Sequence, residues 1–137
     1  MAPRRRVLVV DDDPEIRSTV ALLLSARFDV TEASSGHEAL QKAAAEPCAL
    51  ALVDYEMPGM SGIELVGRLK ERSPELVIVM LTSSRELETA KRALSAGAAE
   101  FVTKPFDPAY LRSELGRLLG APELKEEDAE YRPWKVV

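Results

Sequence analysis

Short apolar runs alternate five times along the chain with longer stretches in which apolar residues recur every three or four positions. The short runs are typical of buried strands, and the longer period is typical of amphipathic helices. The runs predict strands at about 6–10, 28–33, 49–53, 76–81 and 100–103. The stretches between them predict helices at about 14–26, 37–45, 62–72, 85–96 and 108–119. Five strand–helix units predict an α/β fold with a parallel sheet, because right-handed crossovers place helices on both of its faces.

Polar residues mark the starts of two predicted helices. Asp13 and Asp107 each stand directly before a proline, which suits the first helical position because its missing N–H needs no partner there. The aspartate then accepts hydrogen bonds from the first free N–H groups. Apolar residues at helical spacing are expected to face the core. They are Ile16, Val20, Leu23 and Leu24 in the first helix, Ile63, Val66 and Leu69 or Leu65 in the third, and Leu111, Leu115 and Leu118 in the last.

The composition is that of one globular domain. The chain has 137 residues, of which 46% are hydrophobic and 30% are charged. A net charge of −5 gives no reason to expect direct binding to nucleic acid. The apolar run after Arg4-Arg5-Arg6 is four residues long, whereas a signal-peptide core needs roughly 7–15 and a membrane span roughly 20. We therefore expect a cytoplasmic protein without membrane contact.

The single cysteine and the single histidine suggest no chemistry of their own. One cysteine, Cys48, excludes an internal disulfide and a cysteine-based zinc cluster. Its place before the third strand indicates a small packing residue. His37 lies at the polar start of the second helix, so we expect neither a metal-ligand role nor a base role for it.

Polar side chains follow four of the predicted strands. Asp11 and Asp12 come after the first strand, Asp54 after the third, Thr82 after the fourth and Lys104 after the fifth. In open parallel sheets the reactive crevice lies outside the carboxyl ends of the strands. The sequence therefore predicts that acid, hydroxyl and lysine side chains meet in one site.

This set of side chains suits phosphoryl transfer. Crowded carboxylates repel each other unless a cation enters, and Mg²⁺ prefers one or two carboxylates together with phosphate oxygens. Lys104 supplies a point positive charge against a phosphoryl group, and Thr82 supplies a hydroxyl donor. Together with Asp54 they predict a carboxylate that accepts a phosphoryl group. Any one of these residues alone would be an ordinary loop residue, and Asp13 is better explained as a helix cap.

Four motifs in this order carry a family resemblance. They are Val9-Val10-Asp11-Asp12, Asp54-x-x-Met57-Pro58-x-Met60-x-Gly62, Leu81-Thr82-Ser83 and Lys104-Pro105-Phe106. With them, residues 5–119 resemble the receiver domain of two-component response regulators, chemotaxis regulators among them. The resemblance implies a flavodoxin-like, doubly wound sheet of five parallel strands in the order 2-1-3-4-5, in a three-layer α/β/α arrangement.

The resemblance also assigns roles at the site. Asp54 would accept the phosphoryl group from the phosphohistidine of a histidine kinase or a phosphotransfer protein, while Thr82 and Lys104 would each pair with a phosphoryl oxygen. The bond between Lys104 and Pro105 would be cis. The chain would act only on itself, through its own phosphoryl transfer and slow autodephosphorylation, and is not expected to be an enzyme otherwise. Mg²⁺ would be bound by Asp11, Asp12, Asp54 and the backbone carbonyl of Glu56.

A conformational switch is implied as well. Phe101 stands where the family keeps a switch aromatic, which turns inward when Thr82 is drawn to the phosphate. That change would reshape the face formed by the helix at 85–96, the strand at 100–103 and the last helix. An output domain or partner protein would read this face, and a second copy of the chain is a further candidate partner, with no surface assigned to it. Glu56 and Ser84 occupy positions that tune dephosphorylation in the family.

Two alternatives come from other functional classes. A haloacid-dehalogenase-like phosphatase also has an Asp-x-Asp after its first strand, which Asp11 and Asp13 match. A helix begins at once with Pro14, however, and no late Gly-Asp-x-x-x-Asp motif appears. A phosphorylation-independent adaptor with the receiver fold would typically lack the acceptor, an acid or the lysine, and all are present here.

Residues 120–137 depart from the strand–helix rhythm and form a C-terminal extension or linker. The segment carries a charged stretch, 123–128, followed by the aromatic Tyr131-Arg132-Pro133-Trp134. A linker to a further domain, a self-packed extension and a dimer contact all remain open for it.

Overall fold

The computed structural model describes residues 4–120, so the extension expected at 120–137 lies almost wholly outside the described residues. The chain divides into two compact units, the first ending at Lys104 and the second beginning at Pro105. The first unit contains β1 (Arg6–Val10), α1 (Pro14–Leu24), β2 (Asp29–Ala33), α2 (Gly36–Ala45), β3 (Leu50–Asp54), α3 (Gly62–Arg72), β4 (Val77–Thr82), α4 (Leu87–Ala96) and β5 (Glu100–Thr103), and the second contains α5 (Pro108–Leu119).

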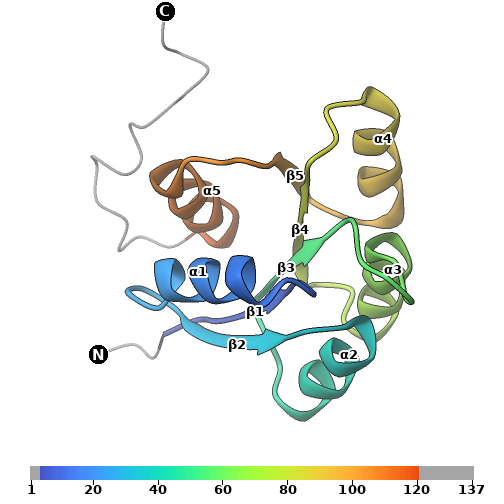
Figure 1. Cartoon of the computed structure of the whole chain (residues 1–137). Helices are drawn as coiled ribbons and strands as arrows, with labels where there is room; N and C mark the ends of the chain where they lie inside the picture. The colour runs from blue at the N-terminus through green and yellow to red at the C-terminus, as the bar shows by residue number, and fades with distance from the viewer. Residues whose placement is uncertain (1–3, 121–137) are drawn as a thin grey trace, which may run out of the picture. The chain divides into compact units, whose positions relative to one another are not determined.

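The five strands form one parallel sheet in the order β2-β1-β3-β4-β5 (Figure 1). This order and the alternation of strands with helices confirm the predicted flavodoxin-like topology. β3 is the central strand and pairs with β1 and β4, with Val53 opposite both Val10 and Met80. Every residue of β3 is buried, as expected for a strand that is covered on both faces.

The sheet of the first unit carries a hydrophobic core on the face covered by α2, α3 and α4, with α1 on the opposite face (Figure 1). Successive side chains of a strand point to opposite faces, so alternate residues of the three inner strands enter this core. The strand residues in the cluster are Leu8, Val10, Ala51, Val53, Ile78 and Met80, and the largest helix residues are Leu65, Val66 and Leu69.

The structure confirms the two aspartate caps that the sequence predicted. Asp13 accepts hydrogen bonds from the N–H groups of Glu15 and Ile16, and Asp107 accepts from those of Ala109 and Tyr110. α4 begins at Leu87 and not at residue 85. Before it, the N–H of Glu86 donates to the hydroxyl of Ser84, and the N–H of Ser84 donates to the hydroxyl of Thr82.

The buried stripes of the helices are narrower than predicted. Four of the residues expected to face the core are only half-buried, namely Ile16, Leu23, Ile63 and Leu118. Small or neighbouring residues take the innermost positions, because a helix that lies close to a sheet buries the residues directly beneath its axis. Ala21 takes such a position in α1, and in α3 both of the expected alternatives, Leu65 and Leu69, are buried. Within 4–120, the structure contains no helix that is long and apolar enough to cross a membrane.

Candidate functional site

The carboxyl ends of β1, β3, β4 and β5 bring the predicted site residues together. The sheet pairing continues just past the strands, where the N–H of Lys104 donates to the carbonyl of Thr82 at 2.7 Å. On the other side, the N–H of Asp11 donates to the carbonyl of Ala33 at 3.1 Å. Asp11 and Asp54 are each 3% exposed and Thr82 is 1% exposed. The backbone therefore holds three polar side chains inside the protein at one edge of the sheet.

Lys104 is the positive charge of this site. Its ammonium donates to Oδ1 of Asp54 at 2.9 Å and lies 3.5 Å from Oδ2 of Asp11. The two carboxylates are thus linked by one lysine, which directly follows β5. The sequence predicted this meeting from the strand ends alone, and the structure places all three groups together.

Burial changes the acidity of both partners. The pKa of Asp54 rises from 3.8 to about 6, chiefly through burial, with the hydrogen bond from Lys104 opposing the rise and the nearby charges of Asp11 and Glu56 adding to it. Burial also works against the charged form of Lys104, but the hydrogen bond from Lys104 to Asp54 and the surrounding carboxylates prevail and raise its pKa. An excess of buried negative charge therefore remains, which favours the entry of a further cation.

The carboxylates of Asp11, Asp12 and Asp54 fit a divalent metal ion. Each offers an oxygen, and these three oxygens lie within 4.8 Å of one another. Oδ2 of Asp11 is buried and accepts no hydrogen bond from any residue of 4–120, although its neighbour Oδ1 accepts from the N–H of Asp13. The Lys104 ammonium lies 3.5 Å from this atom and forms an ion pair with it, but no hydrogen bond. A buried carboxylate oxygen without a hydrogen bond is costly, so this atom is suited to a metal bond. Hard oxygen ligands of this kind suit Mg²⁺.

Asp13 lies beside this cluster but does not belong to it. Its Oδ1 atom accepts from the N–H groups of Glu15 at 2.9 Å and Ile16 at 3.4 Å. Its carboxylate is therefore used as the cap of α1. The Asp-x-Asp pair that a haloacid-dehalogenase-like site would need is not assembled here.

Thr82 is held by Glu56. The hydroxyl of Thr82 donates to Oε2 of Glu56 at 2.9 Å, and both the N–H and the hydroxyl of Ser83 also reach this carboxylate, at 3.4 and 3.3 Å. The sequence identified Glu56 through its backbone carbonyl and its position, but not this side-chain contact. The direction of a loop side chain depends on the loop's path, which the residue pattern does not specify.

Arg17 is a second residue that the sequence did not single out. Its guanidinium donates to the backbone carbonyl of Asp11 at 2.9 Å and to Glu32 at 3.2 Å. It thereby ties the loop of acidic residues to the end of β2. The signal was its position in the first turns of α1, directly after the acidic run.

Phe101 packs against the hydrophobic core from β5. It is half-buried and lies opposite Met80 in the sheet register. Its ring thus belongs to the same side of the sheet as α2, α3 and α4, one residue before the buried Val102 and three before Lys104.

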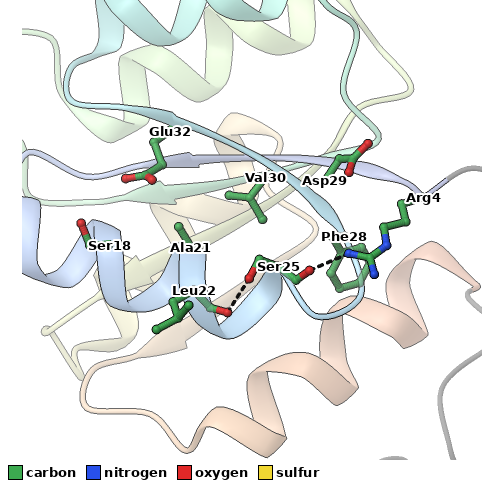
Figure 2. Close-up of a pocket in the computed structure, with 9 residues that line it drawn as sticks. All are labelled: Arg4, Ser18, Ala21, Leu22, Ser25, Phe28, Asp29, Val30 and Glu32. Atoms are coloured by element: carbon green, nitrogen blue, oxygen red, sulfur yellow. Dashed lines mark hydrogen bonds between the residues drawn. The ribbon is translucent and has the colours of Figure 1, made fainter.

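A separate groove lies beside α1 and β2 (Figure 2). It has a volume of about 470 Å³ and contains the exposed side chain of Leu22, while Arg4 donates to the carbonyl of Ser25 at its rim. None of the acidic cluster, Thr82 or Lys104 lines it. This groove is therefore separate from the cluster at the carboxyl ends of the strands.

Known proteins are similar to this chain in both sequence and fold. The family model of the response regulator receiver domain matches residues 7–116. Response regulator protein PilR of Pseudomonas aeruginosa is 37% identical, over 95% of this chain and 29% of PilR. Transcriptional activator protein ExaE of Pseudomonas putida is 38% identical, over 82% of this chain and 54% of ExaE. The chain thus spans about half or less of the length of these relatives.

A solved structure supports the same assignment. The CheY-like response regulator receiver domain protein of Methanospirillum hungatei JF-1 superposes with a TM-score of 0.81 at 31% identity, over 85% of this chain and 94% of that one. The match covers the sheet order and the alternation of strands and helices described above. The chain therefore belongs to the response regulator receiver domain family.

Proposed function

We propose that the chain is the phosphoacceptor of a two-component system and that Asp54 receives the phosphoryl group. The observation that carries the proposal is the position of Asp54, buried at the end of the central strand beside the Lys104 ammonium and two further acids. In the transfer, a carboxylate oxygen of Asp54 forms a bond to phosphorus while the bond from phosphorus to the donor's histidine nitrogen breaks. The nitrogen keeps the electron pair.

The chain's own residues would position and neutralise the transferred group. Lys104 would move its hydrogen bond from the Asp54 carboxylate to a phosphoryl oxygen, and Thr82 would donate its hydroxyl to another. Positioning and charge neutralisation account for most of the rate in phosphoryl transfer. Bound Mg²⁺ would neutralise phosphoryl charge, and its protein ligands would be Asp11, Asp12, Asp54 and the backbone carbonyl of Glu56.

The proposed partners follow from the same chemistry. A histidine kinase or a phosphotransfer protein would supply the phosphoryl group in the cytoplasm, and the domain, expected to span 5–119, would act on no other substrate. Phe101 and Thr82 would change the surface around α4, β5 and α5, which an output domain or partner protein, or a second copy of the chain, would read. The curated relatives are longer than this chain, which is consistent with an output domain in those proteins.

Asp54→Ala should abolish labelling by a small phosphodonor. With acetyl phosphate and Mg²⁺, the wild type should gain one alkali-labile phosphate, as expected for an acyl phosphate, and the variant should gain none. Intact-protein mass spectrometry measures the added phosphate. Asp29→Ala removes an exposed carboxylate from β2 and should label like the wild type. Equal labelling of Asp54→Ala and the wild type would refute the assignment, and no labelling of the wild type would favour a phosphorylation-independent adaptor.

Lys104→Ala should separate metal binding from switching. The cluster of Asp11, Asp12 and Asp54 lacks no ligand in this variant, so its affinity for Mg²⁺ should stay within about threefold of the wild type, or tighten, because a competing positive charge is lost. The phosphorylated variant should show little change in the chemical shifts of Phe101. NMR spectra of the variant with and without phosphodonor measure these shifts. If Phe101 of the variant shifted as much as it does in the wild type, the prediction would be contradicted.

A further inference from the structure

A continuous run of hydrogen bonds leads from the loop after Asp54 to the first turns of α4. Glu56 accepts from the hydroxyl of Thr82 at 2.9 Å, and the same hydroxyl oxygen accepts from the N–H of Ser84 at 3.0 Å. The hydroxyl of Ser84 in turn lies 3.0 Å from that of Thr89 in α4. Four residues thus connect the loop after β3, the end of β4 and α4, with the link from Thr82 to Ser84 made by the backbone N–H of Ser84.

The start of α4 depends on this run of bonds. Ser35, Ser61 and the two aspartate caps bond the first N–H groups of their helices, whereas Glu86 at the N-cap of α4 makes no side-chain cap bond. Instead, the N–H of Glu86 donates to the hydroxyl of Ser84 at 3.2 Å. A helix end without its own cap is positioned by whatever bonds its free N–H groups. Here that group is Ser84, which is itself held through Thr82.

We propose that Glu56 is a latch that holds Thr82 in the unphosphorylated chain, and that phosphorylation frees the amino end of α4 by taking the Thr82 hydroxyl from Glu56. The inference rests on the proposed function of Asp54. A threonine hydroxyl has one proton and donates to one acceptor at a time. A phosphoryl group on Asp54 is an anionic acceptor that competes for this proton, and its charge repels the Glu56 carboxylate.

Release of the latch passes directly to α4. When Thr82 turns its hydroxyl toward the phosphoryl group, its oxygen moves away from the N–H of Ser84. Ser84 then loses one of its three hydrogen bonds, and its contacts with Glu86 and Thr89 loosen as a result. Glu56 itself is exposed, so its carboxylate regains water when it is displaced. The latch is therefore weak enough to be reversible.

The contact itself can be tested without phosphate or metal. In Glu56→Ala, the amides of Ser84 and Glu86 should exchange hydrogen about fivefold faster than in the wild type, the change expected for one lost hydrogen bond. Glu56→Gln keeps an acceptor oxygen and should exchange almost as the wild type does. Glu64→Ala removes another exposed acid, from α3, and is the control. Exchange in Glu56→Ala within about twofold of that control would overturn the latch.

The competition is tested with beryllofluoride, a stand-in for the phosphoryl group, in the presence of Mg²⁺. Glu56→Ala should raise its apparent affinity about fivefold or more, but loss of a negative charge alone would also raise it. A double-mutant cycle of Glu56→Ala with Thr82→Val separates the lost charge from the lost latch, because the latch acts only through the Thr82 hydroxyl. The gain should shrink by at least about threefold in the Thr82→Val background.

Two results of this second test carry different meanings. An equal gain from Glu56→Ala in both backgrounds would show that the glutamate acts by its charge alone, and would overturn the latch. Failure of the wild type to bind beryllofluoride would instead refute Asp54 as the phosphoacceptor and with it the release step, while the exchange measurement still decides whether Glu56 holds Thr82.

Discussion

Asp54→Asn is expected to stabilise the metal-free protein by about 3 kcal/mol at pH 7 and to change its stability little at pH 4. The Asp54 side chain is 4% exposed, and its pKa rises from 3.8 to about 6 on folding, mainly through burial. The folded protein therefore binds this proton more tightly than the unfolded chain does. Asparagine has nearly the same shape without the charge, and it still offers an oxygen to the Lys104 ammonium.

The sign of the pH dependence follows from that direction. Well below the unfolded pKa of 3.8 the carboxyl is protonated in both states, and it costs no stability. As the pH rises toward 6, the unfolded chain releases the proton first, so the wild type loses stability until the folded pKa is passed. Urea unfolding of wild type and variant at pH 4, 5, 6 and 7 measures the widening gap. Asp29→Asn removes an exposed charge and should leave a gap that is small at every pH.

Magnesium should narrow the gap between the two proteins. A ligand that binds only the folded state stabilises it in proportion to the logarithm of its concentration, and the variant lacks one of the three carboxylates. Two results would contradict the raised pKa of the buried Asp54 carboxyl. One is a variant that is less stable than the wild type at pH 7, and the other is a variant that is more stable by the same amount at pH 4 and at pH 7.

Gly62→Ala and Gly67→Ala should have opposite effects although both lie in α3. A Cβ at Gly62 would clash with the backbone carbonyl oxygen of Asp54, and it would lie 2.8 Å from Cε of Met80 and 3.0 Å from Cα of Tyr55. Backbone atoms cannot rotate away, so overpacking should cost about 2 kcal/mol or more. A Cβ at Gly67 meets no atom within 4 Å, so alanine should gain about 0.5–1 kcal/mol through its better helix propensity.

Thermal or urea unfolding of the two glycine variants tests the packing of α3 against the end of β3. The comparison isolates packing, because the helix and the substitution are the same. The added Cβ would press on the backbone of Asp54, so Gly62→Ala should also slow labelling by acetyl phosphate. A stabilised Gly62→Ala variant would mean that the helix does not approach Asp54 as closely as described.

The sequence predicted the parts of the site that depend on strand ends. Asp54 and Lys104 follow strands whose apolar runs are unambiguous, and parallel topology brings their carboxyl ends to one edge. The side chains of Arg17 and Glu56 were not predicted to contact their partners, because both contacts cross between elements. The start of α4 was placed too early for the same reason. Ser84 bonds to Thr82 and Thr89, and no local pattern marks that preference.

The central position of β3 limits which residues near Asp54 can be replaced without loss of packing. The strand that ends in Asp54 is bonded on both sides and buried along its whole length, so almost any replacement of the four apolar residues before Asp54 would disturb packing. The loop residues Glu56 and Ser83, by contrast, are exposed and contact Thr82 or each other from outside the sheet. Under the proposed function, the exposed loop residues can therefore change without disturbing the core, while Asp54 stays fixed at the end of β3.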